Sequence, residues 1–162
     1  AIIDSIEQIE EYVTVARSTN TEQLLPYLID AQEKYIRPNL GTPLLQKIES
    51  HTPNDPEMMG LLRKALVNLA FSIYMPFMQV TIDGTGAHQN RETALFQRTE
   101  DKLQQAFLQT GMNTLDTLLE YLESHMQQYP EFQLSPQYSI RNELFVNRTA
   151  TFQLFATFKT VV

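Results

Sequence analysis

The chain has no cysteine and no tryptophan among its 162 residues, and only five glycines. Without cysteine it can form no disulfide framework, no thiolate metal site and no cysteine nucleophile. The lack of cysteine does not indicate a compartment, because secreted proteins can also do without it. The first residues carry no basic segment followed by an apolar one, so we expect no signal peptide in this chain.

Basic residues are scarce as well: 12 of them face 19 acidic residues, which gives a net charge of -7. The lysines and arginines are dispersed, and no stretch forms a polybasic patch. Nonspecific nucleic-acid binding depends on clustered basic side chains that neutralise phosphates. We therefore expect no nonspecific binding to DNA, and we expect no specific DNA binding either, although an acidic surface would suit a protein past which DNA slides without adhering.

Long uninterrupted apolar runs are also missing. The most apolar stretch, residues 57–80, is interrupted by Arg63, Lys64 and Asn68 and contains Pro76. A membrane-spanning helix usually needs about 18 or more consecutive apolar residues. The sequence therefore predicts no membrane span.

The same stretch, 57–80, predicts a long central helix. Its apolar residues first mark one helical face and then nearly encircle the axis: Met58, Leu61, Leu62, Ala65, Leu66, Leu69, Ala70, Phe71, Ile73, Tyr74, Met75, Phe77 and Met78. A helix that is apolar on all sides needs neighbours on several of them. Chain length suits a single domain, so we predict a mainly α fold, a single-domain helical bundle of about five helices around this helix.

Two amphipathic helices are expected before it, over about 4–16 and 21–37. The second should end near Arg37, because Pro38 disfavours helical geometry in the preceding residue, and Gly41 can complete the stop. Its expected buried face is Leu24, Leu25, Leu28, Ala31, Tyr35 and Ile36.

A short third helix is expected over 42–50, with Thr42 as its cap. Asn54 or Asp55 could cap the central helix. Helical spacing resumes over 91–128, where Gly111 weakens the pattern, so one kinked helix and two separate helices both fit.

Between these helices the pattern changes. Val80 and Ile82 are β-prone and alternate with polar residues, and Asp83, Gly84 and Gly86 form a turn signal. We predict an extended segment or loop at 79–90 and regard these five residues as candidates for contact with a partner.

The C-terminal part is expected to form an extension over 131–162, packed on the domain of residues 1–130 or on a neighbouring chain. It is rich in Phe, Val and Thr, which suits a strand. Phe152 and Phe155 also fit a helical face, and we favour a helix over 146–158. Both phenylalanines are further candidates for contact with a partner.

The polar residues give no pattern of catalytic or metal-binding residues. His51, His88 and His125 lack the spacing of ligands on one helix. Asp116 and Glu120, together with Glu123, lie on one helical face, which is more typical of a solvated surface than of a cation site.

Phosphate-binding motifs do not occur around Gly84 and Gly86, where neither GxxxxGK nor GxGxxG is present. A polar pocket of His88, Arg91 and Glu100 is a remote enzymatic alternative. We predict no catalytic residues, no cofactor, no metal and no enzymatic activity.

Several segments together resemble a known class of protein: TEQLLPYLIDAQEKYIRPNLG, LLRKALVNLAFSIYMPF, VTIDGTG, YLESHMQQYPEF and LFVNRTATFQ. They are similar to the head-tail connector, or head-completion adaptor, proteins of tailed phages and prophages. The pattern I-x-x-A-x-x-x-I before a glycine is matched by Leu28, Ala31, Tyr35, Ile36 and Gly41.

The resemblance implies a structural virion assembly protein that forms a ring oligomer with itself and contacts portal or tail proteins. DNA would only pass through the ring. The protein would be found in the virion, or in the host cytoplasm during assembly. The alternative is a bacterial helical module that binds another protein in an apolar groove, motivated by Met58, Met59, Met75 and Met78.

Overall fold

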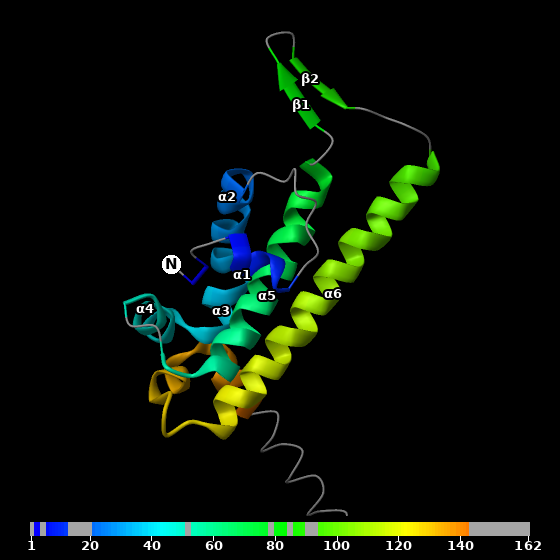
Figure 1. Ribbon diagram of the computed structural model, residues 1–162. Helices are drawn as coiled ribbons and strands as arrows, with labels where there is room; N and C mark the ends of the chain where they lie inside the picture. The colour runs from blue at the N-terminus through cyan, green and yellow to red at the C-terminus, as the bar shows by residue number, and fades with distance from the viewer. Residues whose placement is uncertain are drawn as a thin grey trace, which may run out of the picture.

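The computed structural model describes residues 2–3, 6–12, 21–50, 53–77, 80–83, 86–89 and 94–142. Along the chain the elements are α1 (Ile6–Glu10), α2 (Thr21–Ala31), η1 (Gln32–Ile36), α3 (Arg37–Leu40), α4 (Thr42–Ser50), α5 (Pro56–Tyr74), η2 (Met75–Phe77), β1 (Val80–Asp83), β2 (Gly86–Gln89), α6 (Ala94–Ser124) and η3 (Pro130–Leu134). Residues 136–142 are helical as well. The fold is mainly α, a helical domain around a long central helix, as predicted (Figure 1).

The central helix is α5, and its beginning follows from local chemistry. Asp55 adopts an extended conformation, and its side chain accepts a hydrogen bond from the backbone N–H of Met58. Pro56 occupies the first turn, where a missing N–H is not needed. By length and composition alone Pro56–Phe77 could cross a membrane, but 72% of its apolar window is buried inside the protein. Its apolar surface is therefore used in packing against α2 and α6.

The end of α5 differs from the prediction of a helix over 57–80. The α-helix ends at Tyr74 and continues only as the short 3-10 turn of η2. Pro76 is the reason, because it has no N–H to donate to the carbonyl of Ser72. The side chain of Gln104 donates to that carbonyl instead, at 3.0 Å. Phe77, expected in the core, is 53% exposed as a result of lying past this end.

Residues 94–124 form one helix, α6, antiparallel to α5. Gly111, which weakened the sequence pattern, lies where the two helices approach closely. A Cβ atom at this position would come within 2.7 Å of Cγ of Leu69. Only glycine fits without displacing α5, so the residue that lowers helix propensity is the one that permits the packing.

The segment before α5 contains a second difference. Helical geometry continues through Pro38 to Leu40, beyond the predicted end near Arg37. The five residues of η1 form a π-helical turn, whose wider spacing offers room for the proline ring. The segment stops at Gly41, which has a φ of 82°.

Leu25, expected on the buried face of α2, is instead exposed. The other leucines of that face, Leu24 and Leu28, are buried as predicted. Helix α4 also follows the prediction, with Leu44 and Leu45 turned into the core.

The segment predicted as extended at 79–90 contains an antiparallel hairpin of β1 and β2. Val80 pairs with Gln89, and Asp83 pairs with Gly86. In Figure 1 the hairpin stands beyond the end of α5, away from the helical body.

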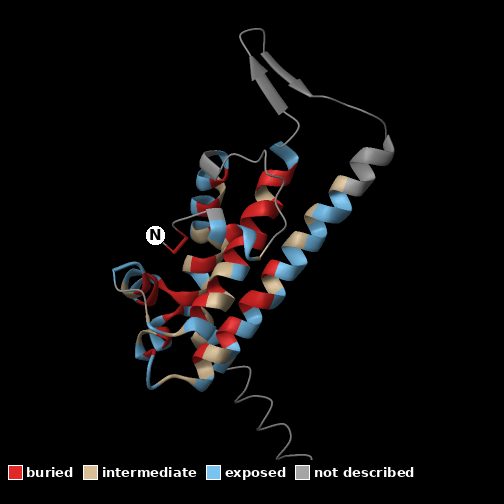
Figure 2. Cartoon of the chain, in the orientation of Figure 1, coloured by how far each residue is buried: buried red, intermediate tan, exposed pale blue. Residues whose placement is uncertain are grey.

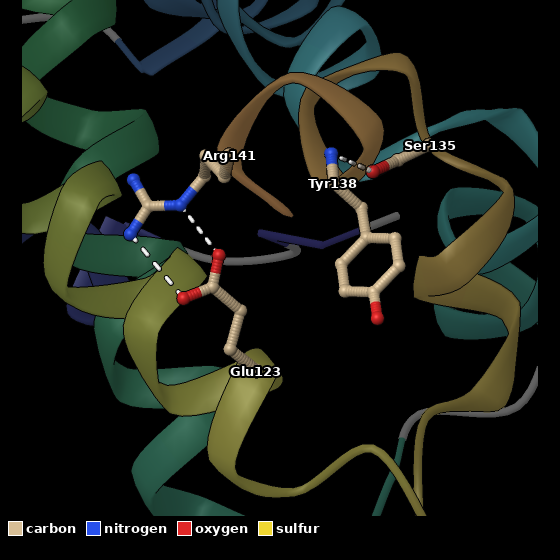
Figure 3. A network of polar contacts seen from close by, with 4 residues as sticks. All are labelled: Glu123, Ser135, Tyr138 and Arg141. Atoms are coloured by element: carbon tan, nitrogen blue, oxygen red, sulfur yellow. Dashed lines mark hydrogen bonds and ion pairs between the residues drawn. The ribbon is translucent and has the colours of Figure 1, made fainter. Parts of the chain in front are cut away.

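The first twelve residues of the predicted C-terminal extension, 131–142, pack on the opposite end of the domain. Phe132 is fully buried, and the Cα atom of Ser135 would lie 3.1 Å from a Cβ at Gly41. Arg141 donates to both carboxylate oxygens of Glu123 on α6, at 2.5 and 3.4 Å (Figure 3). Residues 143–162, which include the predicted helix over 146–158, lie outside the described residues.

Candidate functional site: the arm of α6 and the hairpin

The register between α5 and α6 leaves part of α6 without α5 beside it. Four contacts fix this register: Asp55 with Tyr121, Leu69 with Gly111, Phe71 with Phe107, and Ser72 with Gln104. By this register Phe77 lies opposite roughly residue 100 of α6, so residues 94–100 extend past α5 by about 10 Å. We call residues 94–108 of α6, together with the β1–β2 hairpin, the arm.

The described side chains of the arm are mostly exposed. Leu103 and Leu108 are 46% and 37% exposed, and Phe107 is half-buried. Figure 2 shows the change along α6, where exposed residues predominate toward the hairpin and buried ones toward the other end. The arm therefore presents leucines that the domain itself does not bury.

A row of aromatic rings supports the base of the arm. Phe77 lies 5.7 Å from Tyr27 on α2, and Tyr27 lies 5.0 Å from Tyr74 on α5. Phe71 continues the row, 6.3 Å from Tyr74 and 5.5 Å from Phe107 on α6. Such ring pairs add roughly 0.5 to 1.5 kcal/mol each beyond burial. The row joins α2, α5 and α6 where the arm begins.

The residues predicted to contact a partner are brought together in part. Val80, Ile82 and Asp83 lie on β1, and Gly86 begins β2. Gly84, Phe152 and Phe155 lie outside the described residues. The exposed leucines of α6 were not predicted, because Leu103 follows the same apolar spacing as the buried positions. In the structure the inner face of α6 runs instead through Gln104 and Phe107, which contact Ser72 and Phe71.

A cluster of polar side chains lies at the N-terminal end of α5, opposite the arm. Asp55 accepts hydrogen bonds from the hydroxyls of Tyr121 and Tyr129, at 3.0 and 2.7 Å, in addition to that from Met58. Partial burial acts to raise the pKa of Asp55, but these hydrogen bonds outweigh it and leave the pKa below its usual value. Burial raises the pKa of Tyr129, and its bond to Asp55 raises it further.

The hydrogen bonds of the Asp55 cluster connect the beginning of α5 to α6 and to the segment that follows it. The carboxylate of Asp55 is occupied by three donors, and both tyrosines remain protonated at neutral pH. The sequence predicted Asp55 as a possible cap, but not the two tyrosines, which lie 66 and 74 residues away in the chain.

The two histidines that the structure describes lie on different parts of the chain. His125 stacks on Tyr121 with ring centroids 4.1 Å apart, whereas His88 lies on β2 and His51 is outside the described residues. Across the parts of the chain that the structure describes, no group of three or more His, Asp or Glu side chains could hold a metal ion.

The predicted carboxylate face of α6 is divided. Glu123 is paired with Arg141, while Asp116 and Glu120 are exposed. Of the remote polar pocket, Glu100 is half-buried on the arm, and Arg91 lies outside the described residues.

Comparison with known proteins shows a family relationship. The model of a family of unknown function, DUF6712, matches residues 36–142. No curated protein and no solved structure matches the chain. The matched region contains α5, the hairpin, α6 and the packed segment up to Asn142, which is more than half of the chain. The chain therefore belongs to the family DUF6712.

Proposed function

We propose that this chain is a structural assembly protein of a phage or prophage virion. In this proposal it forms a ring with copies of itself and connects the portal or capsid to the tail. It acts by binding other proteins, uses no cofactor and catalyses no reaction. It works in the host cytoplasm during assembly and afterwards in the virion.

The observation that carries the proposal is the arm. Beside the end of α5, α6 exposes Leu103 and Leu108, which offer apolar surface for a protein neighbour. The row of aromatic rings at its base connects α6 to α5 and, through Tyr27, to α2. The segments that resemble phage connectors include the arm's VTIDGTG turn, which supports the same interpretation.

The net charge of -7 supports the proposed passage of DNA through the ring. Like charges keep DNA from adhering to the protein, so that it can move along the lumen without being held.

The test is the mass of the full chain in solution, measured by light scattering alone and with a portal protein. We expect an oligomer in at least one of these conditions. The double substitution Leu103→Asp and Leu108→Asp should reduce the oligomer, and Gln105→Asp, on an exposed neighbouring position, should not. A strict monomer at high concentration in both conditions would overturn the proposal.

The alternative, a module with an apolar groove, has less support. The methionines that motivated it are core residues: Met58, Met59 and Met75 are all buried, and Met78 lies outside the described residues. What still favours it is the exposed pair Leu25 and Ile29, one helical turn apart on α2. Loss of binding to a host peptide on Leu25→Asp, with an unchanged mass, would favour this alternative over a ring.

A further inference from the structure

We propose that the β1–β2 hairpins of neighbouring copies pair edge to edge, so that β2 of one copy is hydrogen-bonded to β1 of the next. The inference rests on the proposed function in that copies of the chain must assemble into a ring. It goes further by naming the segment that joins the copies and the main-chain chemistry of the joint.

The hairpin is an incomplete sheet. In the part of the chain that the structure describes, the sheet has two strands, so β1 and β2 each keep an outer edge without a strand partner. Figure 1 shows the hairpin beyond the end of α5, where no described helix lies along it. An isolated two-stranded hairpin is at best marginally stable in water, and further strands or a packed helix are the usual remedy. The hairpin therefore needs a neighbour that the described part of its own chain does not supply.

Neither strand has the residues that usually protect an open edge. Natural sheets block their edges with lysine, with other charged residues or with proline, or they cover them. The strands VTID and GAHQ contain no lysine, no arginine and no proline, and their one acidic residue, Asp83, stands beside the turn. Edges without such protection accept a further extended strand through main-chain hydrogen bonds. The hairpin is therefore open to pairing on both sides.

The register determines which backbone groups the two edges offer. Asp83 pairs with Gly86, so two residues separate the strands. The pair that closes such a turn is hydrogen-bonded within the hairpin. The N–H and C=O groups of the next pair, Ile82 and Ala87, are therefore directed outward, toward the free edge of β1 and of β2 respectively.

The two edges of the hairpin suit each other. Because β1 and β2 are antiparallel, a ring of identically oriented copies places β2 of one copy antiparallel to β1 of the next. Copies related by rotation alone have equal heights along the axis. When the strands run along that axis, Ala87 of one copy therefore meets Ile82 of the next, and the outward groups of both residues face each other. A second copy is thus the partner that matches both edges at once.

The spacing of strands determines where the hairpins lie in such a ring. Neighbouring strands are about 4.8 Å apart, so each copy adds about 10 Å to the circumference of the joint sheet. A single helix is already about 10 Å wide, and α2 and α6 both pack on α5, so each helical body needs more of the circumference than that. The hairpins must therefore lie closer to the axis than the helices do. Closure of the ring leaves no strand edge free.

Disulfide cross-linking tests the joint directly, because the natural chain has no cysteine. One variant carries Thr81→Cys, and a second, longer by a fused tag, carries His88→Cys. In the proposed joint these residues form a pair next to the hydrogen-bonded pair of Ile82 and Ala87, where side chains approach most closely. The two variants are mixed, oxidised and separated under denaturing, non-reducing conditions, where the tag distinguishes the mixed dimer from both homodimers.

Two further variants serve as matched controls against His88→Cys. Asp116→Cys, exposed on α6 and remote from the hairpin, measures random collision. Ile82→Cys measures the register, because neighbouring residues of a strand face opposite sides of a sheet. We expect the mixed dimer of Thr81→Cys to exceed those of both controls several-fold. A yield at the collision level, equal yields at residues 81 and 82, or homodimers of Thr81→Cys as the main product would overturn the inference.

Removing one donor tests the main-chain bonds themselves. Ala87→Pro removes the N–H that β2 would donate to the next copy, whereas Ala87→Ser keeps it. The hairpin itself loses no bond, because this N–H is directed away from β1. We expect the proline variant to lose the oligomer and the serine variant to keep it, with the same circular dichroism of the helical domain in both. A proline variant that keeps the oligomer would show that the hairpins do not join the copies.

Light scattering on the full chain separates this inference from the proposed function. An oligomer that is lost in Ala87→Pro supports both. If the full chain is an oligomer but Ala87→Pro and the cysteine pairs show no joint between hairpins, the edge pairing is wrong and the assembly function stands. If the full chain remains a monomer alone and with a portal protein, both fail.

Discussion

The two halves of α6 differ although they belong to one continuous helix. From Gly111 to Leu122 its inner face is closed against α5, with Leu115, Leu118 and Leu119 buried. From Ala94 to Leu108 the described inner positions are only half-buried, and leucines are exposed. Gln104 and Phe107 still contact Ser72 and Phe71, so α5 lies beside this half as well, and Leu103 and Leu108 are exposed on the part of α6 that α5 does not cover. One half stabilises the domain, and the other is available for binding.

The largest expected effect comes from Leu118→Ala, in the closed half. Leu118 has no exposed surface, and removing its side chain should lower the free energy of unfolding by about 2 to 5 kcal/mol. The matched change Leu103→Ala on the arm should alter it by no more than about 0.5 kcal/mol. Urea unfolding of both variants measures the contrast. Equal losses would show that the arm is part of the core.

Asp55→Ala should follow in size, with a loss of about 2 to 4 kcal/mol, because it removes a helix cap and leaves the hydroxyl of Tyr129 without its acceptor. Asp55→Asn keeps a good cap but cannot accept from both tyrosines, so its loss should be smaller. Thermal unfolding of the two variants separates the cap from the tyrosine bonds. An Asn variant as unstable as the Ala variant would contradict this division.

The same residue predicts a dependence on pH. Hydrogen bonds hold the pKa of Asp55 below its ordinary value, and the bond from Lys47 lowers the pKa of Glu131. Their contribution to stability is therefore complete above the unfolded pKa values of about 4 and is lost as the pH falls through the lower folded values. The melting temperature should drop on acidification below that range, and less so in Asp55→Asn. An equal drop in both proteins would assign the effect to other carboxylates.

Glycine substitutions sharpen the comparison of the helix halves at their boundary. Gly111→Ala places a Cβ against Leu69 and should cost about 1 to 2 kcal/mol, since the overpacking exceeds the gain in helix propensity. At Gly60, in α5, the nearest atom to an added Cβ is the Tyr12 hydroxyl at 3.9 Å, so Gly60→Ala should stabilise by about 0.5 to 1 kcal/mol. Chemical denaturation should show a lower free energy of unfolding for Gly111→Ala and a higher one for Gly60→Ala. A stable Gly111→Ala variant would mean that the helices can separate there at little cost.

The smallest expected effect is that of Arg141→Ala, which removes the ion pair with Glu123. Both side chains are partly exposed, so the cost should be no more than about 1 kcal/mol. Amide exchange should nevertheless accelerate over residues 136–142, and not in α5. Unchanged exchange there would show that Phe132 alone holds the segment.

Sequence periodicity predicted the central helix, its cap and the inner face of α4, because each depends on residues close together in the chain. The single helix through Gly111 could not be predicted, since the reason for that glycine is Leu69, which lies far earlier in the chain. The continuation through Pro38 depends on a π-helical turn that no local rule indicates. The exposure of Phe77 depends on where α5 ends, and that of Leu103 depends on which face of α6 meets α5. Contacts between distant residues account for most of these differences.

The hydrogen bond from Gln104 to the carbonyl of Ser72 fixes a length as well as a packing arrangement. It ties one specific turn of α6 to the place where α5 stops, so neither helix can slide along the other without losing it. The reach of the projecting part is thereby set by the number of residues between position 104 and the hairpin. Inserting or deleting a single helical turn there would change the dimensions of any assembly that is built through the arm.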